Sequence, residues 1–200
     1  MNGGAIIVMM LDRLLHGPRV YLAPLTSRDL PTMAQWYQDS GFLRLFDADP
    51  AYPRAESELT EWLDKARRGG DSYAFGIRLI DRNELIGLIE LDEISWSNGV
   101  CGLAIAIGER GYWRKGYGQE AARLALGFAF GELNLHRVQA TILGYNERSI
   151  RMFERLGFRR EGTFREFLHR DGQRHDMHLY GLLRPEWEAR PPEAPDGQAH

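Results

Sequence analysis

Two glycines and two cations lie close together in one loop of the chain, between an apolar strand and a helical pattern. Gly116 and Gly118 let the backbone approach a ligand with no side chain in the way. The helix expected to begin at Gln119 turns its unpaired N–H groups back towards this loop. Together with the side chains of Arg114 and Lys115, these amides predict a site for a phosphate or a pyrophosphate.

Two nucleotide-binding motifs compete for these glycines, and both fit poorly. Gly111 and Gly116 have the separation of a P-loop, but Tyr117 stands where that motif requires lysine. Gly116, Gly118 and Ala121 match the dinucleotide fingerprint GxGxxA. That fingerprint follows a strand directly and needs an acidic residue at the end of the next strand, whereas here an eight-residue loop intervenes and that acid is missing. A nucleoside triphosphatase and a nicotinamide-dependent oxidoreductase are therefore the weaker alternatives.

Composition and charge narrow the class of protein. The 200 residues are 44% hydrophobic and 26% charged, which is typical of one soluble globular domain. The net charge of -3 gives no sign of nucleic-acid binding, and the apolar run of residues 5–11 is too short to cross a membrane. A lone cysteine, Cys101, forms no internal disulfide and favours the cytoplasm. His175 and His178 fall on opposite faces of an expected strand, so no metal site is predicted.

The elements that must position the glycine loop follow from the periodicity of the apolar residues. One strand and two helices come first, then three antiparallel strands, then a helix, a strand, a helix and a hairpin around Asp171-Gly172. We expect strands at 18–25, 73–80, 84–92, 100–107, 136–143, 158–169 and 173–183, and helices at 26–37, 55–68, 119–133 and 147–156. Residues 41–53 are expected to form a loop. This order predicts a mixed α/β sheet with a helical crossover in its second half.

Three parts are expected along the chain. Residues 1–17 are predicted to be a loosely held leader, and residues 18–184 a single domain. The proline, glutamate, glycine and alanine of residues 185–200 predict a disordered tail.

The stretch from residue 103 to residue 162 carries a longer motif. It contains AIGERGYWRKGYGQEAARLALGFAFGELNLHRVQATILGYNERSIRMFERLGFRREG and resembles motifs A and B of the GNAT acetyltransferase superfamily, in particular the Rim-type ribosomal-protein alanine N-acetyltransferases. Trp113, Gly116 and Gly118 fall on the loop pattern of that family, and the resemblance extends over residues 18–187. It implies a single α/β (α+β) domain of GNAT type, with a mixed, mostly antiparallel central sheet and helices on both faces.

The same resemblance implies acetyl-CoA as the cosubstrate. The strand that ends at Ile107 would splay from its neighbour, so that the amides of Ile105 and Ile107 pair with the pantetheine arm. The backbone of residues 114–119 would wrap the pyrophosphate, and Asn146 would bond the pantetheine. Some arginines of residues 147–165 would reach the 3′-phosphate, and the others are predicted to lie on a solvated helix face. The implied cosubstrate contacts are Ile105, Ile107, Arg114, Lys115, Gly116, Tyr117, Gly118, Gln119, Asn146, Ser149 and Arg155.

Acetyl transfer to an amine needs a base for the amine and an acid for the departing thiolate. The usual tyrosine acid of the family falls on Phe153, which has no proton to donate, whereas the serine acid proposed for the Rim-type branch is present as Ser149. The glutamate base of that branch falls on Leu168. Three carboxylates remain as alternative bases: Glu166, two residues back on the same strand face, and Glu90 and Asp92 on the strand beside the central one.

The resemblance implies an acetyl-CoA-dependent N-acetyltransferase that acts on a primary amine, with the α-amine of a protein N-terminus as the first expectation. A polyamine or an aminoglycoside is the alternative acceptor, and a non-catalytic acyl-CoA sensor is the alternative of another class. No nucleic-acid or membrane partner is expected. The oligomeric state stays open, with a homodimer as one arrangement.

Overall fold

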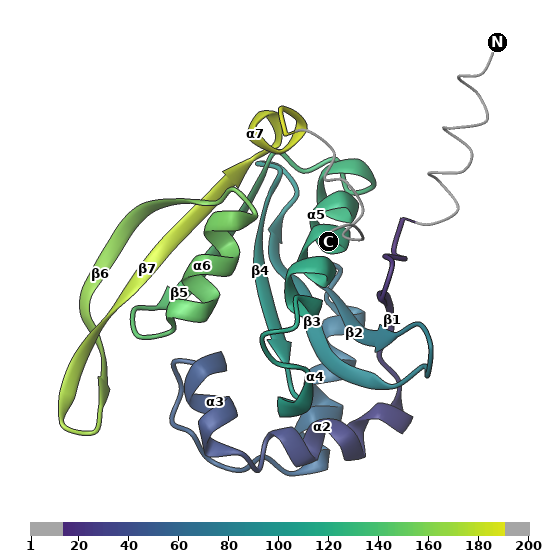
Figure 1. The fold of residues 1–200 in the computed structure, drawn as a ribbon, viewed down its shortest axis with the longest axis vertical. Helices are drawn as coiled ribbons and strands as arrows, with labels where there is room; N and C mark the ends of the chain where they lie inside the picture. Colours follow the sequence, from purple (N-terminus) through teal and green to yellow (C-terminus); the bar gives the residue numbers. More distant parts are fainter. Residues whose placement is uncertain (1–13, 191–200) are drawn as a thin grey trace, which may run out of the picture.

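A computed structural model describes residues 14–190 of the chain (Figure 1). The leader expected at residues 1–17 therefore lies outside the described residues except for its last four positions. There the chain doubles back along the first strand, where the amide of Leu22 donates to the carbonyl of Leu15 over 2.8 Å. Residues 191–200 of the expected tail also lie outside the described range.

A seven-stranded sheet forms the centre of the domain, in the order β1-β2-β3-β4-β5-β7-β6. Among the strands of residues 14–190, only β4 and β5 run parallel, while the other neighbours are antiparallel. This confirms the predicted mixed, mostly antiparallel sheet. The strands are β1 (Val20–Pro24), β2 (Tyr73–Leu79), β3 (Leu85–Ser95), β4 (Val100–Ile107), β5 (Arg137–Leu143), β6 (Arg159–Arg170) and β7 (Gln173–Leu183).

Helices cover both faces of the sheet, as predicted. One apolar cluster joins the sheet to α5, α6 and α7, and a second joins its other face to α2, α3 and α4. The helices are η1 (Ser27–Asp29), α2 (Leu30–Trp36), α3 (Ser40–Phe46), α4 (Glu56–Arg68), η2 (Arg110–Tyr112), α5 (Tyr117–Gly131), α6 (Glu147–Arg155) and α7 (Arg184–Glu188). Within residues 14–190, none of these helices has the length and the apolar character that crossing a membrane requires.

The two parallel strands separate shortly after they begin. Their pairing covers only Val100 to Gly102 of β4 against Arg137 to Gln139 of β5, although β4 continues to Ile107. Figure 1 shows β5, β6 and β7 diverging to the left of β4 beyond that point. The predicted splay is therefore confirmed, and it opens a gap in the middle of the sheet.

The start of α5 is fixed to the first strand by a buried carboxylate. Glu120 accepts hydrogen bonds from the amides of Arg19 and Val20 at 2.8 and 2.9 Å, and from Nε of Arg19 at 2.8 Å. These three hydrogen bonds, one of them from a cationic guanidinium, compensate the negative charge of the buried Glu120 side chain. The glycine loop that leads into α5 is therefore attached to the edge of the sheet.

The prediction of a loop at residues 41–53 is wrong for its first part, where α3 runs from Ser40 to Phe46. Asp39 caps this helix by accepting from the amides of Gly41 and Phe42 at 2.9 and 3.2 Å. Its apolar side chains pack under the sheet beside α2 and α4. Asn146 also donates to the carbonyl of Leu45 across 2.9 Å, a long-range contact that local sequence does not reveal.

The expected start of the disordered tail also differs from the structure. Residues 184–188 form the short helix α7, and the ring of Trp187 lies 6.0 Å from that of Phe130 on α5. Pro185 sits in the first turn of this helix, where its missing N–H has no intrahelical role. The composition of the segment predicted disorder. It gives no sign that Trp187 packs against a residue as distant as Phe130.

Candidate active site

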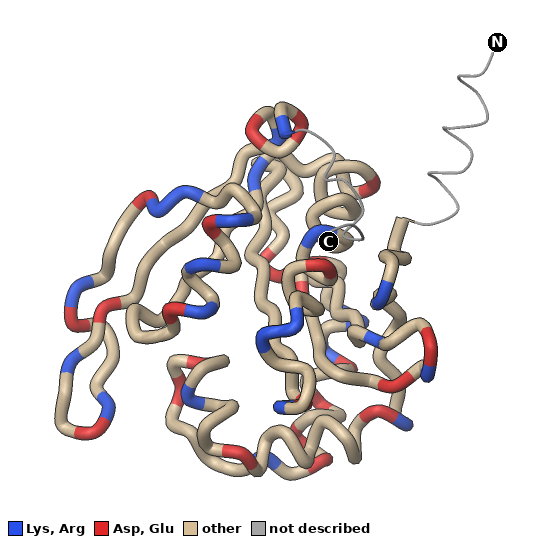
Figure 2. The backbone as a smooth tube through the Cα atoms, in the orientation of Figure 1, with Lys and Arg blue, Asp and Glu red and all other residues tan. Residues whose placement is uncertain are grey.

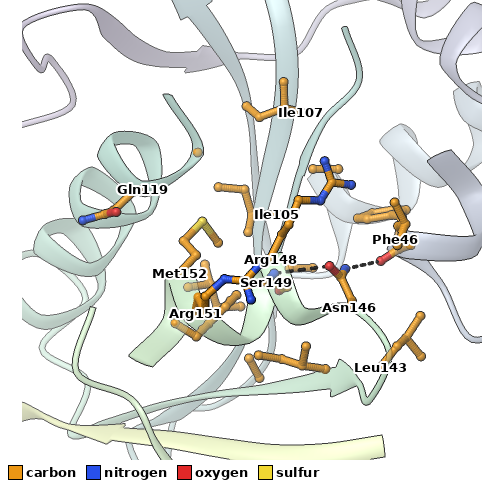
Figure 3. A pocket seen from close by; sticks show the side chains of 18 of the residues that line it. Phe46, Ile105, Ile107, Gln119, Leu143, Asn146, Arg148, Ser149, Arg151 and Met152 are labelled. Atoms are coloured by element: carbon orange, nitrogen blue, oxygen red, sulfur yellow. Dashed lines mark hydrogen bonds between the residues drawn. The ribbon is translucent and has the colours of Figure 1, made fainter. Parts of the chain in front are cut away.

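A cavity of about 800 Å³ occupies the gap between β4 and β5. Its walls come from β4, the loop and first turn of α5, the start of α6, and α3 on the other face of the sheet. Figure 3 shows side chains of β4 and α6 around this cavity, including Ile105, Ile107, Asn146, Ser149 and Met152. The cavity therefore passes through the sheet and is reached by elements from both of its faces.

Two backbone amides of β4 face into the gap. The amide of Gly108 donates to the carbonyl of Ile86 on β3 over 2.9 Å, and positions along an antiparallel ladder alternate between bonded and unbonded pairs. Ile107 and Ile105 therefore occupy the unbonded positions, and their amides point away from β3. In agreement, the carbonyl of Ile107 faces the same way and accepts from Nε1 of Trp113 at 2.7 Å. These amides can pair with an extended ligand that contains amide groups.

The loop before α5 presents an anion-binding helix end. Gly116 is the N-cap of α5 with a φ of 84°, and Arg114 also has a positive φ of 62°. The helix begins at Tyr117, two residues earlier than predicted, so Gly118 and Gln119 lie in its first turn. The first N–H groups of a helix have no internal partner and carry the positive end of its dipole. This geometry suits a pyrophosphate.

Two arginines, Arg114 and Arg148, line the same end of the cavity, and a third, Arg110, contacts the nearby Trp113 ring while its charge is paired with Asp39. The guanidinium of Arg148 lies 4.4 Å from the ring centre of Trp113, and that of Arg110 lies 5.0 Å from the same ring. Burial, followed by the charges of Arg114 and Arg110, holds the pKa of Arg148 below its usual range. Cations that repel one another in this way favour the binding of an anion between them.

Asn146 and Ser149 lie together at the start of α6. The side-chain oxygen of Asn146 caps the helix by accepting from the amide of Ser149 at 3.2 Å, and its nitrogen donates to Leu45. One N–H and one lone pair of the Asn146 amide group are left for a ligand. In the described part of the chain, the Ser149 hydroxyl has no hydrogen-bond partner. It lines the cavity and is therefore available to a bound molecule.

Two carboxylates project from the same face of β3, and one of them lines the cavity. Asp92 pairs with Gly102, the last residue of β4 that contacts β5, and a Cβ added to Gly102 would lie 2.0 Å from the Asp92 carboxylate. Glycine at this position therefore makes room for the carboxylate where the gap begins. Burial and then the charge of Glu93 raise the pKa of Asp92. Glu90, two residues earlier, lies behind Asp92 and does not line the cavity.

Glu90 provides a test of this electrostatic arrangement. Burial, followed by the charge of Asp92, raises its pKa from 4.5 to about 7. Ionisation of Glu90 therefore costs more in the folded chain than in the unfolded chain, so its contribution to stability falls as the pH rises from 4.5 towards 7. We expect Glu90→Gln to melt close to the wild-type temperature at pH 4 and above it at pH 8. A melting difference that is equal at both pH values would contradict the raised pKa.

The prediction that Glu166 shares a strand face with Leu168 is wrong. β6 pairs Phe164 with Met177 and Leu168 with His175, so three residues of β6 lie opposite Asp176 alone. In this bulge Glu166 has a φ of 54° and is exposed, whereas Leu168 is buried. The bulge breaks the two-residue alternation on which the prediction depended. Glu166 does not line the cavity.

A family model for the acetyltransferase (GNAT) domain matches residues 19–159. The chain belongs to the GNAT acetyltransferase family. The matched residues contain the glycine loop, the three carboxylates of β3 and every residue that lines the cavity except Leu179.

Curated relatives and solved structures agree with this assignment. The SPbeta prophage-derived uncharacterized N-acetyltransferase YokL of Bacillus subtilis is 32% identical over 68% of this chain and 76% of its own length. The [ribosomal protein uS5]-alanine N-acetyltransferase of Escherichia coli is 29% identical over 80% of this chain and 85% of its own. Spermidine N-acetyltransferase from Vibrio cholerae, solved in complex with CoA and spermine, shares the fold with a TM-score of 0.79, at 23% identity over 86% of this chain and 99% of that one.

Acetyl-CoA is the cosubstrate of this GNAT enzyme, which is an N-acetyltransferase. The residues in place fit such a molecule, because inward amides, a helix N-terminus and an arginine cluster follow one another along the cavity. Most of the predicted contact residues line it, namely Ile105, Ile107, Arg114, Gly116, Tyr117, Gly118, Gln119, Asn146, Ser149 and Arg155, whereas Lys115 does not. Lys115 instead accepts a hydrogen bond at its carbonyl from Arg19 over 2.9 Å. In residues 14–190 no group of His, Cys, Asp or Glu side chains is arranged to hold a metal ion.

Two residues of the GNAT site were not singled out from the sequence. Gly102 was treated as part of an apolar strand, although a glycine inside a strand often marks a close approach. Arg148 was included among arginines expected largely on a solvated helix face, yet it is half-buried against Trp113. One feature of the sequence could have identified Arg148. It lies two residues after Asn146, on the turn of α6 that faces the cavity.

Replacing Arg148 with alanine is expected to weaken acetyl-CoA binding without destabilising the free GNAT protein. The substitution removes a cation that its neighbours already repel. A hydrogen bond to a charged group is worth about 1.5–3 kcal/mol. We therefore expect the dissociation constant for acetyl-CoA to rise by roughly ten- to a hundredfold. Calorimetric titration measures the affinity, and a thermal melt serves as the control for folding; unchanged affinity would place Arg148 outside the site.

Proposed function

We propose that this enzyme acetylates a primary amine at the α3 side of the cavity, and that its acceptor is the α-amine of a protein N-terminus. The carboxylates around the site support an amine acceptor. Asp47 and Asp49 share one cation, because a nitrogen of Arg54 lies 3.6 and 3.7 Å from their carboxylate oxygens, so Arg54 offsets one of their two negative charges. Asp92 and Glu93 line the cavity and form no ion pair in the described part of the chain. They provide negative charge where a cationic amine would enter.

The protein N-terminus is favoured by the relative that acts on the alanine of ribosomal protein uS5, which aligns with 80% of this chain. A cytoplasmic location, which the single cysteine favours, is part of the same proposal.

The proposed chemistry assigns one proton transfer to Asp92 and another to Ser149. Asp92 accepts a proton from the ammonium group, directly or across one water, and its raised pKa brings it closer to that of the amine. The neutral amine nitrogen then attacks the thioester carbonyl carbon. As the carbon–sulfur bond breaks, the nitrogen loses its second proton to solvent and becomes a neutral amide, and Asp92 releases the first proton to solvent afterwards. The free Ser149 hydroxyl donates a proton to the sulfur and regains one from solvent. Backbone amides of β4 hold the cosubstrate in register during this exchange.

A polyamine is the second candidate acceptor. The unpaired charges of Asp92 and Glu93 suit a molecule that carries several ammonium groups. A solved structure that shares this fold was obtained with CoA and spermine, at 23% identity. Either acceptor would present a primary amine to the same carboxylates.

The deciding experiment compares acceptors in one assay of thiol release from acetyl-CoA. Peptides that begin with alanine are tested against the same peptides with a blocked α-amine, and against spermidine and spermine. We expect release with the free peptides alone. Release with polyamines and not with peptides would replace the proposed acceptor. Binding of acetyl-CoA without release in any sample would favour the non-catalytic sensor.

A further inference from the structure

The side chain of Arg19, which directly precedes β1, bonds the glycine loop on both sides of Gly116. Its Nη1 donates to the carbonyl of Lys115 over 2.9 Å, and its Nε donates to the Glu120 carboxylate over 2.8 Å. Its guanidinium carbon also lies 5.0 Å from the ring centre of Tyr117. These contacts join the edge of the sheet to the residue before Gly116 and to the first turn of α5.

The bond to Lys115 sets the direction of a loop amide. The carbonyl of Lys115 and the N–H of Gly116 belong to one trans peptide plane, in which they point in opposite directions. Because the carbonyl faces Arg19, the N–H of Gly116 points away from Arg19, and Gly116 lines the cavity. If this plane turned over, a carbonyl oxygen would replace that N–H and would repel a pyrophosphate. Arg19 therefore favours the orientation that suits an anion.

The backbone of the loop needs a contact of this kind. Arg114 has a φ of 62°, which is strained for a residue with a side chain, and such a conformation persists where neighbouring contacts hold it. A Cβ on Gly116 would lie 3.1 Å from Nη2 of Arg19, so this glycine also makes room for the guanidinium. Figure 2 shows positive charge along the loop that enters α5. That charge attracts an anion but does not orient the amides.

Arg19 is itself held in place and lies outside the cavity. The buried Glu120 carboxylate accepts from the backbone amides of Arg19 and Val20 as well as from the guanidinium. Arg19 is not one of the residues that line the cavity. Any effect of Arg19 on a bound cosubstrate is therefore transmitted through the loop.

We propose that Arg19 is a positioning residue, which fixes the glycine loop in the conformation that binds the pyrophosphate of acetyl-CoA. This role concerns one part of the cosubstrate. The pantetheine arm pairs with the amides of Ile105 and Ile107, which lie on β4 and have no bond to Arg19. Loss of the Arg19 bonds therefore weakens the binding of the pyrophosphate and leaves the binding of the pantetheine unchanged.

Arg19→Lys tests this assignment, because lysine keeps the positive charge but has one nitrogen in place of the two that bond Lys115 and Glu120. Two ligands are titrated into each protein: acetyl-CoA, and acetylpantetheine, which has the same thioester and arm but no pyrophosphate. NMR titration also measures weak binding. We expect the dissociation constant for acetyl-CoA to rise by at least roughly tenfold and that for acetylpantetheine to keep its wild-type value.

Arg137→Lys is the matched control. Arg137 bonds Glu161 through two nitrogens, between β5 and β6, and neither residue lines the cavity. This variant should bind both ligands as the wild type does, and thermal melts compare the stability of the two variants. Wild-type affinity of Arg19→Lys for acetyl-CoA would overturn the proposal. So would an equal loss of affinity for both ligands, which indicates a general change in the fold. No acceptor is present, so these outcomes are independent of the proposed acceptor.

Discussion

Asp92→Asn is expected to lower kcat by about 100-fold or more, within the range of 10²–10⁴ that a positioned general base contributes. Asparagine keeps the size of the side chain over Gly102 but accepts no proton at neutral pH. The KM for acetyl-CoA should change little, because Asp92 lies opposite the last paired residue of β4 and β5, away from the glycine loop. Steady-state kinetics with a saturating acceptor and varied acetyl-CoA, followed from pH 6 to pH 9, measure both parameters.

The rival carboxylate provides the comparison for that result. Glu166→Gln is expected to keep the wild-type kcat, because Glu166 is exposed on the β6 bulge and does not line the cavity. If Glu166→Gln lost activity while Asp92→Asn retained it, the base would have to be reassigned to Glu166. In the wild type we expect activity to fall as Asp92 becomes protonated at low pH. The asparagine variant should lack this acidic limb.

Gly118→Leu is expected to weaken acetyl-CoA binding by at least roughly tenfold, which is about 1.4 kcal/mol. A Cβ at Gly118 would lie 3.5 Å from the sulfur of Met152, 3.6 Å from Ile107 and 3.9 Å from Ile105. These are ordinary contact distances, so a single methyl group fits. The remaining atoms of leucine would extend into the space between α6 and β4 that the pantetheine needs. Calorimetric titration with acetyl-CoA measures the effect.

Two further variants show whether the loss comes from blocked space. Gly118→Ala should keep or raise the melting temperature, since alanine favours a helix over glycine. Gly127 lies in the same helix, and a Cβ there would have no neighbour within 4 Å, so Gly127→Leu is the matched control. We expect Gly127→Leu to bind acetyl-CoA as the wild type does. Equal affinity of Gly118→Leu and the wild type would show that α5 does not border the cosubstrate.

Several local features were predictable because they depend on residues that are close in sequence. Asp171 and Gly172 both have positive φ in the turn between β6 and β7, as expected of that dipeptide in a hairpin. Gly157 ends α6 with a φ of 90°, as a left-handed stop requires. The strand, loop and helix around Gly116 were likewise present in the local pattern of glycines and apolar residues.

Other features depended on contacts between distant residues and could not be predicted in this way. The helix α3 is held by Tyr145 and Asn146, each of which bonds a carbonyl 101 residues away. The β6 bulge depends on its register with β7, which the alternation of one strand does not specify. Strict alternation of side chains along β6 alone therefore placed Glu166 on the same face as Leu168.

The sequence alone indicated the family and predicted the cosubstrate loop, because the glycine loop, the strand before it and the helix after it form one continuous segment whose backbone amides suit the ligand. The tertiary structure alone decided which of the three candidate carboxylates, Glu90, Asp92 or Glu166, lines the cavity. That choice depends on the pairing of β3 with β4, on the space above Gly102 and on the point where β4 leaves β5. Each of these is a relation between separate strands. The periodicity of a single strand does not specify its register with a neighbouring strand.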